Sequence, residues 1–360
     1  MKSLSSLLHG LVKSLFSGWT RSSPWPGMES GRESADSMAR DARKNDMILR
    51  SSGTVNGEGS NSFVSVFSRR GEKGVNQDCC IVWKEFGCQE DMIFCGIFDG
   101  HGPWGHFVAK MVRESLPSSL LCNWQETLIL SSLGLDLDFM HKKISQFDIW
   151  KQSYLRSCAT IDKELEQHCG LDSFYSGTTA LTFVKQGDLI ILANVGDSRA
   201  VLATTNDDGI LVPTQLTVDF RPNLPQEAER IIQCNGRVFC LHDEPGVHRV
   251  WLPDEESPGL AMSRAFGDYC IKNFGIISVP EVTHKSITTR DKFIVLATDG
   301  VWDVISNHEA VQIVSSTPER GKAAQRLVEH AVRAWRRKRR GIAVDDCSAI
   351  CLFFEPSLPS

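Results

Sequence analysis

The 360-residue sequence has no C-x-x-C pair among its 12 cysteines and no apolar run near the roughly 20 residues of a membrane span. The first absence argues against a thiolate zinc site, and the second against a transmembrane helix. Many cysteines stand inside apolar, strand-like runs, where free cysteine acts as a small hydrophobic residue in a reducing compartment. We therefore expect an intracellular protein of the cytoplasm, the nucleus or both.

An excess of positive charge is also missing, because 39 Lys and Arg face 44 Asp and Glu, for a net charge of −5. Phosphate backbones are bound by basic faces, so this balance argues against nucleic acid as a partner. Acidic residues gathered at one site would instead hold cations. No internal repeat is visible, and we expect a monomer with a sizeable core, since 41% of the residues are hydrophobic.

Residues 1–62 are expected to form an N-terminal extension. No acidic residue precedes Glu29, and apolar residues recur at helical spacing within residues 4–19, which predicts a short amphipathic helix. That helix would make peripheral contact with a membrane, direct the chain to an organelle, or pack on the protein's own body. Lys2 stands where N-myristoylation needs glycine, which excludes that anchor. From Arg21 to Ser62 the composition predicts a disordered linker.

Residues 63–355 are expected to form one α+β domain, with sheets packed together and helices outside. Four strands between residues 181 and 217 lie at hairpin spacing, which indicates an antiparallel sheet. Residues 241–260 are rich in Pro, Asp, Glu and Gly and predict an exposed loop. The other expected strands are 63–67, 79–83, 292–298 and 347–354, and the expected helices are 104–117, 147–165, 225–234, 307–316 and 322–337.

Aspartates stand at the ends of several of these strands, beside glycine or other turn residues. The apolar run that ends in Asp99-Gly100-His101-Gly102 is the clearest case, and Asp299-Gly300 repeats its logic. Each aspartate alone is a common turn residue, and spacing does not establish that they meet in space. The full set is Asp78, Asp99, Asp197, Asp299 and Asp345.

Converging carboxylates repel one another unless a cation lies between them. Mg²⁺ or Mn²⁺ suits such oxygen ligands. Two ions about 3.5–4 Å apart can share a carboxylate and activate a bridging water for attack on phosphorus. His101 would then protonate the leaving oxygen as the general acid.

The series of motifs resembles the metal-dependent serine/threonine phosphatases of the protein phosphatase 2C (PPM) family, and its plant branch in particular, over about residues 63–355. The motifs that carry the resemblance are Gly74–Asp78, Phe98–Gly102, Ser176–Ala180, Ala193–Arg199, Leu216–Asp219, Ser263–Asp268 and Asp299–Asp303.

The resemblance implies a central β-sandwich of two antiparallel sheets flanked by α-helices, in four layers α-β-β-α, with two Mg²⁺ or Mn²⁺ ions at one end. Asp99 would bridge the ions. Asp78 and the Gly100 carbonyl would complete the first site, and Asp299 and Asp345 would hold the second. The neighbouring Asp346 is an alternative to Asp345, and Asp197 and Asp303 resemble ligands of a weaker, optional third ion.

The sequence departs from the family at several positions. Gln77 replaces a frequent glutamate, which predicts a weaker or shifted metal preference. Lys73 replaces the phosphate-binding arginine, so phosphate would be held without a bidentate fork. The loop around Trp251 does not match the loop of the branch that abscisic-acid receptors inhibit.

The resemblance implies hydrolysis of phosphoserine or phosphothreonine in phosphorylated protein substrates. No C-x₅-R loop is present, which disfavours the cysteine phosphatases. The alternative is a catalytically weak protein of the same fold that binds phosphoproteins, and a two-metal nuclease is disfavoured by the acidic balance. The run Arg336–Arg340 is either a nuclear-localisation patch or the solvated basic end of a helix.

Overall fold

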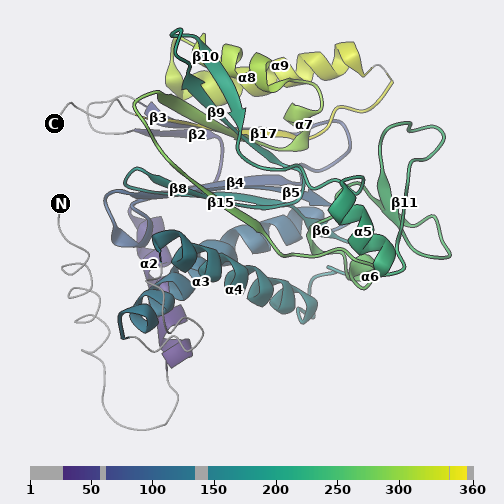
Figure 1. Ribbon diagram of the computed structural model, residues 1–360, viewed down its shortest axis with the longest axis horizontal. Coiled ribbons are helices and arrows are strands. Elements are labelled where there is room, and N and C mark those ends of the chain that lie inside the picture. The colour runs from purple at the N-terminus through teal and green to yellow at the C-terminus, as the bar shows by residue number, and fades with distance from the viewer. Residues whose placement is uncertain (1–26, 57–61, 134–144, 340, 355–360) are drawn as a thin grey trace.

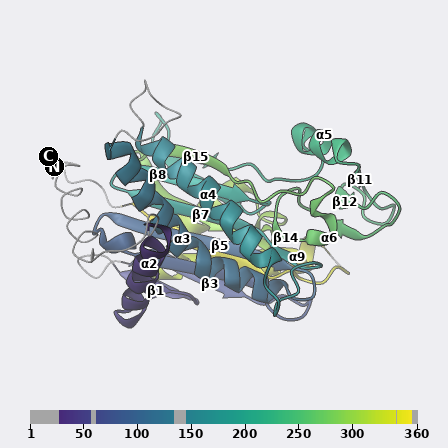
Figure 2. The ribbon, with the colours of Figure 1, turned by 90° about the horizontal axis from the view of Figure 1, so that it is seen from below.

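The computed structural model describes residues 27–56, 62–133, 145–339 and 341–354, in which two sheets pack face to face between helical layers (Figure 1). Helices α2 (Gly27–Lys44), α3 (Gly105–Leu133) and α4 (Gln146–Glu166) cover the first sheet, as Figure 2 also shows. Helices α8 (Asn307–Ser315) and α9 (Ala323–Lys338) cover the second. The expected four-layer α-β-β-α architecture is confirmed.

Both sheets are antiparallel throughout. The first has the order β1 (Ile48–Leu49), β4 (Asp78–Lys84), β5 (Met92–His101), β7 (Ala180–Gln186), β8 (Leu189–Val195) and β15 (Glu281–Ser286). The short strands β6 (Gly177–Thr178) and β14 (Phe266–Gly267) extend it beside β5. The second has the order β10 (Leu211–Gln215), β9 (Arg199–Thr205), β16 (Asp291–Ala297), β17 (Cys347–Phe353), β3 (Ser62–Arg69) and β2 (Gly53–Asn56).

Central strands are apolar on both faces because each face meets another layer. In β16, Ile294 and Leu296 pack between the sheets, while Phe293 and Val295 pack under the outer helices. Cys95 lies in the layer between the sheets, and all 12 cysteines are free. Cysteine therefore serves in the strands as a small core residue, as the sequence indicated.

The disordered linker predicted from Arg21 to Ser62 is wrong for residues 27–56, which form α2, β1 and β2. Three alanines of α2, spaced along one face, are buried against the body of the protein: Ala35, Ala39 and Ala42. An ion pair from Arg32 to Glu164 joins α2 to α4. The composition did not indicate this helix, because its buried side chains are small alanines and the segment has few large apolar residues. The amphipathic helix expected at residues 4–19 lies outside the described residues.

We expect Ala35→Asp to destabilise the protein by about 2–4 kcal/mol, because Ala35 is fully buried and an unpaired carboxylate there would lose its hydration. Thermal unfolding of the full chain measures the effect. Ser37→Asp, on the exposed side of the same helix, is the matched control. Equal melting temperatures for the two variants would show that α2 does not pack as described.

The strands between residues 181 and 217 do not form one sheet. The β7–β8 hairpin belongs to the first sheet and the β9–β10 hairpin to the second. The chain crosses between the sheets at residues 196–198, where Gly196 has a positive φ of 109°. Hairpin spacing predicts which strands pair, but it carries no information on this crossing.

The exposed loop predicted at residues 241–260 is in part a small sheet of β11 (Arg237–Phe239), β12 (Arg249–Trp251) and β13 (Pro258–Leu260). Trp251 is 4% exposed, and its indole N–H donates to the Phe239 carbonyl at 3.2 Å. With α5 (Pro225–Gln233) and α6 (Tyr269–Lys272), this sheet has its own apolar cluster at one end of the sandwich (Figure 2).

Helix α3 continues well past the expected end at residue 117. Pro117 stands inside it, between the buried Leu116 and Leu120, so packing on both sides outweighs the lost hydrogen bond. The described part of the chain has no helix that is both long and apolar enough to cross a membrane.

The basic run after residue 335 forms the last turn of α9, while Arg340 lies outside the described residues. Lys338 donates to the Val304 carbonyl at 2.6 Å, and Arg336 lies 3.4 Å from a Glu72 oxygen. Cations at a helix C-terminus interact favourably with its dipole. These contacts favour the helix-end interpretation over the localisation patch.

Candidate active site

Strand register brings the predicted ligands to one end of the sandwich. Asp78 and Asp99 are direct partners on β4 and β5. Asp299 begins α7 (Asp299–Trp302), just after β16. Asp345 lies just before β17, and β17 is the antiparallel neighbour of β16. The Thr298 hydroxyl donates to Asp78 Oδ2 at 3.0 Å and so joins the ends of the two sheets.

The carboxylates form one electrostatic cluster. Burial, reinforced by the charges of the neighbouring acids, raises the pKa of Asp99 and of Asp299 well above its usual value. Burial also raises the pKa of Asp78 to about 8 and that of Asp197 to about 7. These groups therefore resist ionisation at neutral pH unless positive charge compensates them.

The oxygen atoms present suit hard divalent cations. Asp78 Oδ1 and Asp197 Oδ1 are buried and have no hydrogen-bond partner, which is costly for a polar atom. Within the described ranges, no three or more His, Cys, Asp and Glu side chains are grouped closely enough to hold an ion by themselves. Mg²⁺ typically keeps several waters and takes only one or two carboxylates, so the donor set fits such an ion.

Glycine at position 100 is required by packing. A Cβ there would lie 2.4 Å from the Gly105 carbonyl oxygen, at the start of α3. Gln77 lies against the same place, because a Cβ at Gly105 would be 2.2 Å from Gln77 Oε1. That amide oxygen is buried without a hydrogen-bond partner. Gln77 thus presents an oxygen beside the cluster without adding a charge.

Asp345 and Asp346 have different surroundings. Asp346 accepts hydrogen bonds from the backbone N–H groups of Gly71, at 2.7 Å, and Gln77, at 2.8 Å. Asp345 Oδ2 instead faces Lys73 Nζ at 2.6 Å. Asp346 therefore holds the backbone of the β3–β4 connection, and its charge also raises the pKa of Asp78, whereas the charge of Asp345 acts on Asp99 and Asp299.

Lys73 supplies positive charge at the edge of the cluster. Burial opposes its ionisation, but the carboxylates of Asp345, Asp299 and Asp99 outweigh burial and raise the pKa of Lys73. Its side chain is 52% exposed, so the ammonium group can still reach solvent. Lys73 is thus a partly exposed cation at the edge of the cluster.

His101, the last residue of β5, lies beside a buried acid. Its Nε2 is 2.7 Å from Asp268 Oδ2, while its Nδ1 is buried without a hydrogen-bond partner. Asp268 has a positive φ of 57° and a side chain that is 4% exposed. A Cβ at Gly177 would lie 2.2 Å from the Asp268 carboxylate, so glycine there leaves room for the pair.

The two residues expected at a third metal site are bridged by an arginine. Arg221 Nη2 lies 2.8 Å from Asp303 Oδ1, and Arg221 Nε lies 3.9 Å from Asp197 Oδ2. These opposite charges together with the hydrogen bond to Asp303 outweigh burial and raise the pKa of Arg221. The guanidinium thus offsets part of the charge of this pair, while the pKa of Asp197 stays raised.

Sequence reasoning missed the roles of Asp268, Thr298 and Arg221. Asp268 was visible as an acid directly after Gly267 in the motif 263–268, a turn signal that can place a carboxylate beside another strand end. Thr298 precedes Asp299 and has no distinguishing pattern. Arg221 lies 24 residues from Asp197 and 82 from Asp303, so only the fold reveals the contact.

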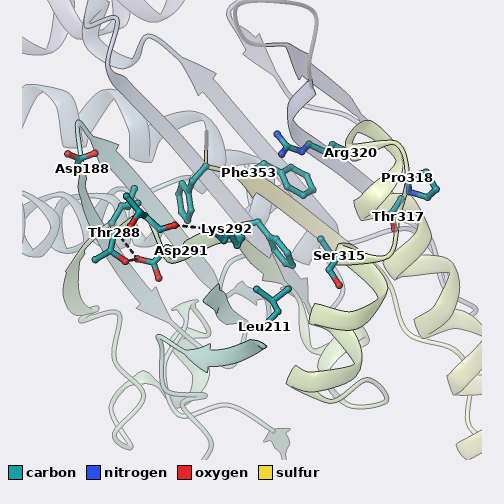
Figure 3. A pocket seen from close by; sticks show the side chains of 15 residues that line it. Asp188, Leu211, Thr288, Asp291, Lys292, Ser315, Thr317, Pro318, Arg320 and Phe353 are labelled. Carbon is teal, nitrogen blue, oxygen red and sulfur yellow. Dashed lines mark hydrogen bonds between the residues drawn. The ribbon is translucent and has the colours of Figure 1, made fainter. Parts of the chain in front are cut away.

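A cavity of about 580 Å³ lies elsewhere, at the opposite ends of β16 and β17 (Figure 3). Asp291 and Phe353 line it, at the ends of these strands far from Asp299 and Asp345. Thr288 donates to Asp291 Oδ2 through both its backbone N–H and its hydroxyl, at 2.8 and 2.9 Å. None of the predicted site residues lines this cavity.

Residues 63–339 match the family described as protein phosphatase 2C. The chain is 65% identical over 359 residues to probable protein phosphatase 2C 73 of Arabidopsis thaliana, covering 99% of this chain and 96% of that protein. It is 62% identical over 360 residues to probable protein phosphatase 2C 48 of Oryza sativa subsp. japonica, covering 98% and 99%.

Among solved structures, serine-threonine phosphatase 2C from Toxoplasma gondii matches with a TM-score of 0.73. The match covers 86% of this chain and 99% of that chain at 23% identity, so it supports the fold alone.

Proposed function

Because the chain belongs to the protein phosphatase 2C family and is a protein serine/threonine phosphatase, we propose that it hydrolyses phosphoserine and phosphothreonine at the aspartate cluster. Two Mg²⁺ or Mn²⁺ ions, when bound, would supply an activated water and neutralise charge on the phosphoryl group. The proposed ligands are Asp78, Asp99, the Gly100 carbonyl, Asp299 and Asp345.

The observation that carries this proposal is the buried set of carboxylates with raised pKa values and unpartnered oxygens. A cluster of this kind is unfavourable without positive charge, and it recurs in proteins at functional sites. Arg221 donates a hydrogen bond to Asp303 and lies 3.9 Å from Asp197, whose pKa is still raised to about 7. Within the described residues no ion pair with Lys or Arg involves Asp78, Asp99 or Asp299, so these carboxylates are the ones that the two proposed ions would neutralise.

His101 is the proposed general acid. Asp268 Oδ2 lies 2.7 Å from Nε2 and fixes the ring, which leaves the buried Nδ1 as the nitrogen without a partner and the proposed proton donor once substrate contacts it. Asp268 is then a positioning residue for His101.

Lys73 is proposed to bind the substrate phosphate. In the structure without substrate its ammonium pairs with Asp345. A cation held by Asp345 would take the place of Lys73 as its partner, and the three donors of Lys73 would then be available to the phosphate oxygens. Its long side chain allows this exchange, at the cost of less rigid phosphate binding than arginine would give.

The direct test is phosphate release from a phosphothreonine peptide, measured in EDTA and with added Mn²⁺ or Mg²⁺. We expect release only with the metal ions. Peptide binding without release at any concentration of either ion would contradict the proposal and favour the non-catalytic phosphoprotein-binding alternative.

Asp345→Asn and Asp346→Asn should affect different properties. Asp345→Asn should raise the Mn²⁺ concentration for half-maximal activity by about 10-fold or more, because a ligand loses its charge. Asp346→Asn should mainly lower the melting temperature, because one oxygen that accepts a backbone N–H is lost. Manganese titrations and thermal unfolding of both proteins distinguish these outcomes, and the reversed pattern would exchange the two assignments.

A further inference from the structure

The exposed aromatic side chains of the described residues all belong to two short segments beside the candidate active site. They are 44–56% exposed, whereas every other aromatic side chain in the described ranges is buried or half-buried. The largest exposed apolar patch of a soluble protein is often functional. We call this set the aromatic patch, and it consists of Trp104, Phe107, Phe174 and Tyr175.

The two segments adjoin through their backbones. A Cβ at Gly102 would lie 2.2 Å from the Tyr175 carbonyl oxygen, and the Trp104 N–H donates to Ser176 Oγ at 2.9 Å. Within each segment the rings pack together: the ring centroids of Trp104 and Phe107 are 5.4 Å apart. Those of Phe174 and Tyr175 are 4.8 Å apart. The patch is therefore built from two preformed ring pairs on neighbouring turns.

The aromatic patch borders the proposed general acid. Trp104 follows His101 by three residues, so their Cα atoms are at most about 11 Å apart. Tyr175 precedes Gly177 by two residues, and Gly177 pairs with His101 across β5 and β6. Residues that flank a phosphorylated residue bound at His101 are therefore within reach of these two segments.

We propose that the aromatic patch binds an aromatic or large aliphatic residue of the phosphoprotein substrate, within about three positions of the phosphorylated residue. A peptide advances about 3.3 Å per residue, so this range matches the span from His101 to Trp104. The proposal rests on the function given above and specifies its substrate class. Rigid, preformed ring pairs lose little conformational entropy on binding, which suits recognition of a short segment.

The size of the patch favours a peptide over a second copy of the chain. Four half-exposed rings offer about 400 Å² in total. A stable protein–protein interface needs about 800 Å² from each partner. The patch thus fits one or two substrate side chains, and its continuity with the active site identifies the substrate as the occupant.

The test uses phosphothreonine peptides of one sequence in which a single phenylalanine is moved from position −3 to +3 in an otherwise alanine background. For the full-length Mn²⁺ enzyme we expect kcat/KM to rise about 10-fold or more for at least one position. The measured quantity is the ratio of kcat/KM between that peptide and the all-alanine peptide. Because the ratio is taken within each protein, a general loss of activity cancels.

In the double variant Trp104→Ala/Tyr175→Ala the ratio should fall to about 1. Ile210→Ala removes an exposed side chain in the β9–β10 turn, at the other end of the strands, and should keep the wild-type ratio. A wild-type ratio of 1 at every position, or a ratio unchanged in the double variant, overturns the proposal.

Two further readouts separate this proposal from others. If p-nitrophenyl phosphate is hydrolysed with Mn²⁺ while the peptide ratio stays at 1, the proposed function stands and the aromatic patch proposal fails. If neither peptides nor p-nitrophenyl phosphate are hydrolysed, the proposed function itself fails. Dimerisation that the double variant abolishes would assign the patch to a second copy and overturn the substrate proposal.

Discussion

Asp99→Asn is expected to lower phosphate release on the order of 10³-fold and yet to raise the melting temperature of the protein in EDTA. Asp99 is the proposed bridging ligand, so the amide would weaken both metal sites. Without ions the same carboxylate destabilises the folded protein, because burial and the charges of Asp78, Asp299 and Asp345 disfavour its ionised form. Asparagine removes the charge at almost constant volume.

The gain in stability should be a few degrees, since about 1 kcal/mol shifts the melting temperature of a chain of this size by roughly 2–4 °C. Asp254→Asn, in an exposed loop, is the control and should change neither activity nor melting temperature. With saturating Mn²⁺ the wild type should have the higher melting temperature, because the ions bind the folded wild type more tightly than the folded Asp99→Asn variant. A variant that is less stable than wild type in EDTA would contradict the electrostatic description of the cluster.

The same electrostatics predict how the stability of the metal-free protein depends on pH. The folded-state pKa values of Asp78 and Asp197, about 8 and about 7, exceed the value of 3.8 for an aspartate in an unfolded chain, so the folded state binds more protons between these limits. The contribution of these groups to stability is therefore fully present below about pH 4 and falls as pH rises from about 4 to about 8. Melting temperatures measured in EDTA over this pH range test the prediction, and saturating Mn²⁺ should make the melting temperature less dependent on pH there.

His101→Ala is expected to lower kcat by about 10²–10⁴-fold, because the leaving oxygen would depart without a proton donor. Its effect on KM and on the Mn²⁺ concentration for half-maximal activity should be small, since the ring is not among the proposed metal ligands. Steady-state kinetics on a phosphothreonine peptide over a manganese titration separates the two effects. Unchanged turnover would remove His101 from the mechanism.

A better leaving group supplies the internal control for His101. p-Nitrophenolate needs little protonation, so the loss in His101→Ala should be much smaller on p-nitrophenyl phosphate than on the peptide. Asp268→Asn should show the same pattern with a loss of about 10–100-fold, as expected for a residue that orients another. Equal losses on both substrates would indicate damage to the site instead of loss of a proton donor.

The sequence predicts the strands and most helices because apolar periodicity reflects burial, and both faces of β16 and β17 are buried. It predicts which residues stand at strand ends, and the resemblance to a family assigns them to ions. It does not predict α2, whose packing depends on small alanines, nor the contact of Arg221 with Asp303, which only tertiary structure creates. The choice between Asp345 and Asp346 likewise needs hydrogen-bond partners, which sequence does not give.

The segment before residue 63 determines which fragments of the protein can fold without exposing sheet edges. β1 pairs with β4 at the edge of one sheet, and β2 pairs with β3 at the edge of the other. A fragment that begins at Phe63 would lack β1 and β2, and their partners β4 and β3 would be left with unpaired backbone groups. Such strand edges are templates for pairing with other chains. A fragment that ends at Arg339 would also lose β17, a central strand. The unit that folds without aggregating should therefore extend at least from Gly27 to Phe354.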